Sequence, residues 1–189
     1  QQTLAPVIDQ KSILVMAGDH GVVEEGVSAY PQEVTPAMVQ TFLAGGAAIN
    51  AISRQVGAYV WVVDMGIVSQ LDVSHIPGAD RLIVAKIGNG TANFTTGPAM
   101  SRQDAEKALL IGFEHATRLI EDGADLLGTG DMGIGNTTPS AAIGAVLCGA
   151  SLDAMVGRGT GVDEAGLVRK RDIVRQGIEI NAPDPQDGL

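Results

Sequence analysis

Short apolar runs that stop at a glycine recur along the chain. SILVMAG begins at Ser12, AYVWVVDMG at Ala58 and ADLLGTG at Ala124, and RLIVAKIG from Arg81 has a similar form. Runs of this length without polar alternation are typical of strands that are buried on both faces of a sheet. We therefore expect four strands at these positions.

Segments with apolar residues at helical spacing separate the strands. The first begins at a Thr35 cap, with Pro36 in the first helical position, and continues to Val56. Gly45-Gly46 lies inside it and is interpreted as a close packing contact, since glycine disfavours a helix interior. Further helices are predicted from the capping box of Ser101 and Asp104 to about 122, from 138 to about 147, and from about 167 to 181.

Strands that alternate with helices predict an α/β fold with a doubly wound, mostly parallel sheet of the Rossmann-like kind. We assign residues 1–189 to a single α/β core domain. The stretch APDPQDGL after Asn181 has a loop pattern, and the first ten residues lead abruptly into a buried strand. We expect the chain to be part of a longer protein.

Composition narrows the classes of function. Hydrophobic residues make up 45% of the chain and charged residues 18%, which is typical of a globular protein. The net charge of -10 argues against binding to nucleic acid or to an anionic membrane through a basic face. The single cysteine, Cys148, excludes an internal disulfide, and no apolar run reaches the roughly 18 residues of a membrane span. A cytoplasmic location is expected.

The stretch LLGTGDMGIGNTTPSAAI, from Leu126 to Ile143, combines four glycines with the start of a helix at Thr138-Pro139. Glycines let the backbone approach a ligand closely, and the first N–H groups of a helix lack partners and favour an anion. The pattern matches neither a Walker loop nor a Rossmann fingerprint. It indicates a phosphate cradle, although a tight turn followed by a helix cap would explain the same residues.

A second glycine-rich stretch, MVGRGTGVDEAGLVRK from Met155, carries Gly159 and, further on, Lys170. A basic side chain near such a turn suits a phosphate, whereas Arg169 and its neighbours also fit a solvated helix face. Asp19-His20 follows the first strand, but a lone histidine beside an aspartate is more often structural. No grouped metal ligands are found, so no metal is assigned.

Six motifs in order carry a family resemblance. They are DHGVVEEGVSAYPQEVT, FLAGGAAIN, VVDMGI, GPAMSR, GDMGIGNTTPSAAI and VGRGTGVD. From about Lys11 onward the chain resembles the nicotinate-nucleotide–dimethylbenzimidazole phosphoribosyltransferase (CobT) family of cobamide biosynthesis. The resemblance implies transfer of phosphoribose from nicotinate mononucleotide to a lower-ligand base, with release of nicotinate. It also implies a homodimer that needs no cofactor and binds small-molecule substrates.

The resemblance places the phosphate near Gly133, Gly159 and Lys170. It places the base in a pocket that contains the side chains of Tyr30, Met38 and Met132. On spacing alone, Met38 is more often a core residue of its helix, and Tyr30 is equally an exposed loop residue.

Two features depart from the family pattern. The family's general base, a glutamate in a C-terminal GEG-S/T-G motif, is absent from the 189 residues, as is the N-terminal helical segment. Asp131 stands where the family usually has glutamate, and we assign it as an auxiliary catalytic carboxylate; ordering of the loop is its other interpretation. We therefore expect the isolated chain to be inactive. A non-catalytic paralogue or partner subunit that binds nucleotide, and a phosphate-binding α/β enzyme of another reaction, remain alternatives.

Overall fold

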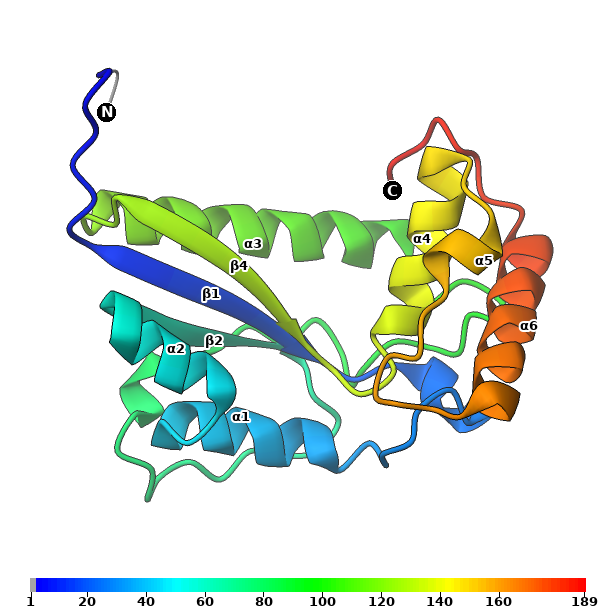
Figure 1. Cartoon of the computed structure of the whole chain (residues 1–189), viewed down its shortest axis with the longest axis horizontal. Coiled ribbons are helices and arrows are strands. Elements are labelled where there is room, and N and C mark those ends of the chain that lie inside the picture. The colour runs from blue at the N-terminus through cyan, green and yellow to red at the C-terminus, as the bar shows by residue number, and fades with distance from the viewer. Residues whose placement is uncertain (1–2) are drawn as a thin grey trace.

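A four-stranded parallel sheet forms the centre of the computed structural model, which describes residues 3–189 (Figure 1). The strand order is β3-β2-β1-β4. The strands are β1 (Lys11–Gly18), β2 (Ala58–Gly66), β3 (Leu82–Val84) and β4 (Leu126–Met132). The predicted positions and the parallel arrangement of all four strands are confirmed.

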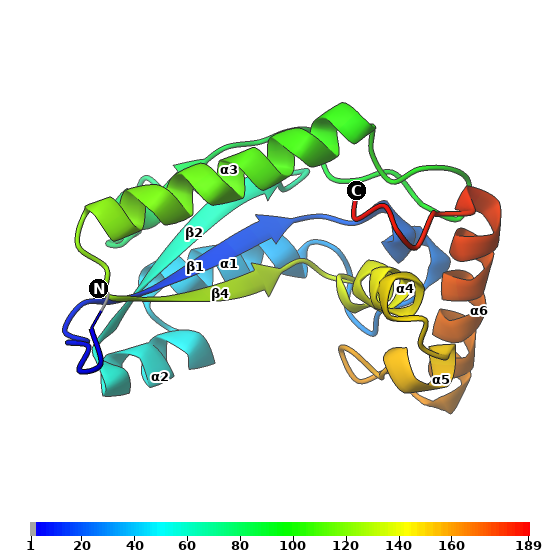
Figure 2. The ribbon, with the colours of Figure 1, turned by 90° about the horizontal axis from the view of Figure 1, so that it is seen from above.

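Helices cover both faces of this sheet, as a doubly wound fold requires. The α-helices are α1 (Val34–Ala44), α2 (Ala48–Val56), α3 (Arg102–Glu121), α4 (Thr137–Cys148), α5 (Leu152–Met155) and α6 (Glu164–Asn181). Two 3-10 helices, η1 (Gly21–Glu25) and η2 (Ala79–Arg81), complete the described elements. Figure 2 shows α3 on one face of the strands and α1 and α2 on the other.

The core consists of separate clusters on the two faces of the sheet. On one face, Val39 and Leu43 of α1 pack with Val62 of β2. On the other, Leu119 of α3 packs with Leu14 of β1. Both strand residues come from uninterrupted apolar runs, so each run supplies side chains to both layers as the sequence pattern predicts.

Helices α4, α5 and α6 lie beyond the arrowheads of the strands and not on a face of the sheet (Figure 1). They pack on one another through Ala141, Val156 and Val174, all of which are buried. This arrangement places the beginning of α4 next to the carboxyl end of β4, where the glycine-rich loop connects them. Within residues 3–189, none of the helices combines the length and the apolar composition that a membrane span needs.

The prediction of one helix from Thr35 to Val56 is wrong. Gly45 adopts a left-handed backbone with φ of 79° and ends α1, with its N–H donated to the carbonyls of Phe42 and Thr41. Thr35 is also no cap, because it lies within the first turn of α1, fully buried. Its hydroxyl accepts a hydrogen bond from the backbone N–H of Ile134, at 3.0 Å. The residue therefore fixes α1 to the glycine-rich loop.

The starts of the other helices follow the sequence more closely. Ser101 is the N-cap of α3, and its hydroxyl accepts the N–H of Asp104 at 3.1 Å, as the capping box predicts. Helix α4 begins at Thr137, one residue before the predicted Thr138, and follows Asn136, whose side chain makes no capping bond. Helix α5 is not predicted by the sequence pattern.

Candidate active site

A cavity of about 300 Å³ opens beyond the carboxyl ends of β1, β2 and β4. Ligands of parallel α/β sheets bind at this edge. The ionisable residues in its wall are Asp19, His20, Asp104 and Asp131. No three histidine, cysteine or acidic side chains are placed to hold a metal ion anywhere within residues 3–189.

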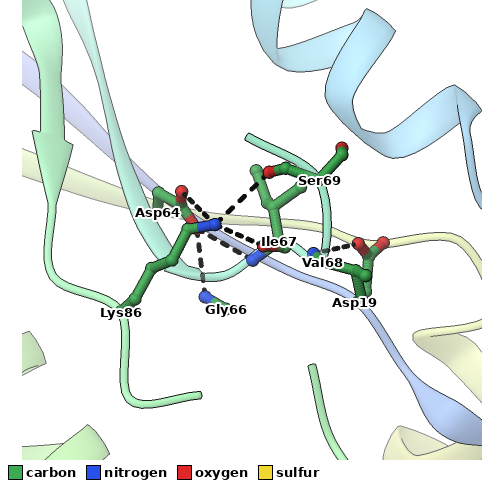
Figure 3. A network of polar contacts seen from close by, with 7 residues as sticks. All are labelled: Asp19, Asp64, Gly66, Ile67, Val68, Ser69 and Lys86. Atoms are coloured by element: carbon green, nitrogen blue, oxygen red, sulfur yellow. Dashed lines mark hydrogen bonds and ion pairs between the residues drawn. The ribbon is translucent and has the colours of Figure 1, made fainter. Parts of the chain in front are cut away.

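An ion pair between the buried Asp64 and the partly exposed Lys86 supports the loop that follows β2 (Figure 3). Asp64, which is 1% exposed, accepts the backbone N–H groups of Gly66 and Ile67 at 3.1 and 2.9 Å. The Nζ of Lys86 lies 3.6 Å from the other carboxyl oxygen of Asp64 and donates to the carbonyls of Ile67 and Ser69. Satisfied buried charges of this kind hold a loop in one conformation. Gly66, in this loop, forms part of the cavity wall.

Asp19 connects the ends of β1 and β2 beside the cavity. Its Oδ2 accepts the N–H of Val68 at 2.8 Å (Figure 3). Its own N–H donates to the carbonyl of Gly66 at 3.1 Å. The second carboxyl oxygen, Oδ1, is buried and has no hydrogen-bond partner within residues 3–189. Such unpartnered buried acceptors are rare in folded proteins and call for a specific explanation.

His20 is held against Gly133 of the glycine-rich loop. The backbone around His20 is clamped by Thr91, which donates to the carbonyl of Asp19 at 3.0 Å and accepts from Gly21 at 3.1 Å. A Cβ built on Gly133 would lie 2.8 Å from the His20 Nε2, so the imidazole covers that face of the glycine. Burial lowers the pKa of His20, and the nearby carboxylates of Asp131 and Asp19 oppose that shift.

Asp131 lies near the end of β4, and its side chain contributes to the cavity wall. Its Oδ2 accepts a hydrogen bond from the Asn136 side-chain amide at 2.7 Å, which closes the loop between β4 and α4. Met132, the next residue, belongs to the opposite face because strand side chains alternate. It packs against the cluster that includes Val39 of α1.

Lys170 of α6 and Gly159 meet at the first turn of α4. The Lys170 side chain is 1% exposed and donates to the Thr137 hydroxyl at 2.7 Å and to the Gly157 carbonyl at 3.0 Å. A Cβ built on Gly159 would lie 2.6 Å from the Thr137 Oγ1 and 2.9 Å from the Lys170 Nζ. Only glycine leaves space here. Burial lowers the pKa of Lys170.

The three residues predicted to hold phosphate are therefore found in two places. Gly159 and Lys170 adjoin one another, whereas Gly133 contacts the carbonyl of Gly18 and the ring of His20. The loop from Gly133 to Thr137 joins the two places. The contribution of Thr137 was missed from the sequence, where the helix was predicted to begin at Thr138 and Thr137 was given no role of its own.

The residues predicted to bind the base do not form part of the wall of the 300 Å³ cavity. Tyr30 is 56% exposed in the loop before α1, Met38 is half-buried on α1, and Met132 packs in the core as described above. The thioethers that do contribute to the cavity wall belong to Met16, Met65 and Met100. The sequence offered one signal for the first two, because both lie within two residues of the glycine that ends their strand.

Known proteins resemble this chain along its whole length. The family model DBI_PRT, described as a phosphoribosyltransferase, matches residues 1–189. A relative from Geotalea uraniireducens (strain Rf4) is 49% identical over 98% of this chain and 51% of its own length. One from Roseiflexus sp. (strain RS-1) is 50% identical over 97% of this chain and 51% of its own. Both relatives bear the name nicotinate-nucleotide–dimethylbenzimidazole phosphoribosyltransferase.

Solved structures agree with these sequence matches. The crystal structure of CobT from Thermus thermophilus superposes with a TM-score of 0.88 at 50% identity, over 96% of this chain and 53% of that one. The chain thus spans about half the length of the relatives that it matches. With the α/β fold, the glycine-rich loop and the sequence matches in agreement, the chain belongs to the DBI_PRT phosphoribosyltransferase family.

Proposed function

We propose that the protein containing this chain transfers the phosphoribosyl group of nicotinate mononucleotide to dimethylbenzimidazole or a similar base. The products are an α-ribotide and nicotinate, in cobamide biosynthesis. The observation that carries the proposal is 49–50% identity, over nearly the whole chain, to proteins named for this reaction. The buried cation at the glycine-rich start of α4 supports it, because it suits a phosphate group.

The proposed transfer reaction requires few catalytic groups from the protein. In nicotinate mononucleotide the ring nitrogen on the ribose is cationic, so its bond electrons return to that nitrogen and neutralise it. A nitrogen of the incoming base forms the new bond to the same sugar carbon and must lose a proton. A positioned carboxylate is suited to accept that proton. Asp131 is our auxiliary candidate, and the principal base that the family resemblance implies, a glutamate in a GEG-S/T-G motif, is not among the 189 residues.

We further propose that the phosphate is held by Lys170 with Gly159 and Gly133, and that Tyr30 and Met132 bind the base together with Met38. The contact of Gly159 with the Lys170 ammonium supports the first assignment. The second rests on the family resemblance alone. A homodimer, a cytoplasmic location and small-molecule substrates without an added cofactor complete the proposal.

The test is a transfer assay on the full-length gene product with nicotinate mononucleotide and dimethylbenzimidazole. Formation of α-ribazole phosphate and nicotinate in equal amounts, at about 1 per second or faster, is the expected result. Size-exclusion chromatography with light scattering measures the dimer separately. Binding of nicotinate mononucleotide without any transfer, across a panel of bases, would contradict the proposed reaction and favour a non-catalytic binding protein.

A further inference from the structure

The cavity at the strand ends has the wrong charge for an anion. Asp19, Asp104 and Asp131 form part of its wall, and among the described residues no lysine or arginine does. Carboxyl groups of this kind repel phosphate and carboxylate, and they accept hydrogen bonds from hydroxyl groups. The cation that suits phosphate, Lys170, lies outside this cavity. The cavity is therefore better matched to the uncharged sugar of a nucleotide.

Of the four ionisable side chains in this wall, the other three are aspartates. His20 differs from them because its neutral imidazole carries an N–H that can donate a hydrogen bond. Thr91 fixes its backbone from both sides. Its ring packs on Gly133, yet neither ring nitrogen is hydrogen-bonded to a residue in the range 3–189. A rigidly placed imidazole with unused hydrogen-bonding capacity is a suitable ligand contact.

We propose that His20 is a ribose-binding residue of this site, with its imidazole hydrogen-bonded to a sugar hydroxyl of the nucleotide. A hydroxyl is the matching group, because it can accept from the imidazole N–H while donating to a carboxyl oxygen in the same wall. The His20 ring lies against Gly133 and shares the cavity wall with Asp131, so the contact would hold the sugar near the auxiliary carboxylate. The inference rests on the proposed function and names a residue that the sequence pattern had marked as structural.

Titration calorimetry on the full-length gene product tests the contact with three ligands. They are nicotinate mononucleotide, nicotinate riboside, which lacks the phosphate, and inorganic phosphate. His20→Phe keeps a flat ring over Gly133 but removes both nitrogens. Loss of one hydrogen bond should lower the affinity for nicotinate mononucleotide and for nicotinate riboside equally, by about two- to tenfold. The affinity for inorganic phosphate should not change. His75→Gln is the control, since His75 is exposed and outside the cavity.

The 2′-deoxy and 3′-deoxy forms of nicotinate mononucleotide identify which ribose hydroxyl His20 contacts. The effect of His20→Phe should disappear with the form that lacks the contacted hydroxyl, as in a double-mutant cycle. NMR of the unmodified protein gives a measurement that does not depend on the variant's folding. The His20 ring resonances should shift with nicotinate riboside and not with inorganic phosphate.

Three results would overturn the inference while leaving the proposed function intact. One is unchanged affinity of His20→Phe for nicotinate mononucleotide, which would make the ring a packing group for Gly133. Another is a loss confined to the phosphate-bearing ligands. The third is an equal effect of the substitution on both deoxy forms. If the unmodified protein binds neither nucleotide nor riboside, the proposed function and this inference both fail.

Discussion

Replacing Lys170 by methionine should selectively weaken binding of the phosphate group. Its ammonium has three N–H donors, of which two are used by the Thr137 hydroxyl and the Gly157 carbonyl. The third remains for a ligand. A hydrogen bond from a charged donor contributes about 1.5–3 kcal/mol, and about 1.4 kcal/mol corresponds to a factor of ten. Lys170→Met should therefore weaken nicotinate mononucleotide binding by about ten- to a hundredfold.

The assay is titration calorimetry on the full-length gene product, with nicotinate riboside as the ligand that lacks phosphate. Its affinity should change by less than about twofold, since it offers Lys170 nothing to bind. Arg169→Met is the matched control, because Arg169 is the neighbouring cation but is exposed. Thermal unfolding checks that the variant is folded, as two hydrogen bonds are lost while a buried charge is removed.

Equal losses for the mononucleotide and the riboside would refute this reasoning. Lys170 would then act only by tying α6 to the first turn of α4, and its substitution would disturb the whole site. Unchanged affinity for both ligands, with a folded variant, would equally show that the third donor does not reach the phosphate.

Three further predictions concern other parts of the site. Gly159→Ala should destabilise the fold by at least about 1–2 kcal/mol in urea unfolding, because the backbone is left-handed at φ of 54° and the new methyl group would clash; Gly157→Ala, with open space around it, should cost much less. Burial lowers the pKa of His20, so the folded state binds fewer protons than the unfolded state as the pH falls below 6.5. The free energy of unfolding should therefore be level above pH 6.5 and decrease below it. His20→Gln should flatten this part of a urea-denaturation series measured against pH. Met132→Ala should cost about 2 kcal/mol in thermal unfolding and weaken dimethylbenzimidazole binding about tenfold, with little change for nicotinate mononucleotide, whereas Met132→Leu should be close to neutral in both assays.

Local patterns account for what was predicted correctly about the fold. Buried parallel strands leave uninterrupted apolar runs in the sequence, and each of the four runs became a strand. The capping box at Ser101 is likewise complete within four residues, so its hydrogen bond could be expected without knowledge of the rest of the chain. The alternation of strands and helices was then enough to predict the doubly wound sheet.

Errors occurred where a residue could serve two purposes. A glycine pair fits a close contact between helices as well as the end of a helix, and the left-handed conformation of Gly45 is what ends α1. Thr35 has the chemistry of a cap, but its hydroxyl bonds to Ile134, 99 residues away. The choice between such uses depends on partners that are distant in the chain.

The fold class, the glycine-rich loop between β4 and α4 and the family could all be inferred from the amino-acid sequence alone. The sequence also marked Lys170, since a basic side chain near a glycine-rich turn suits a phosphate, and the family resemblance singled out Gly159. The folded chain was needed to show that Thr137 joins these two residues and that His20 covers Gly133. Both pairings join segments more than 20 residues apart, so they depend on how helices and loops pack at one edge of the sheet.

The two faces of β4 show the same division. Adjacent residues on a strand point to opposite sides, so Asp131 faces the cavity while Met132 enters the core beside α1. The alternation itself can be read from the sequence. Which side holds the cavity cannot, because that depends on where α1 and α3 pack and on which side chains they leave uncovered at the strand ends.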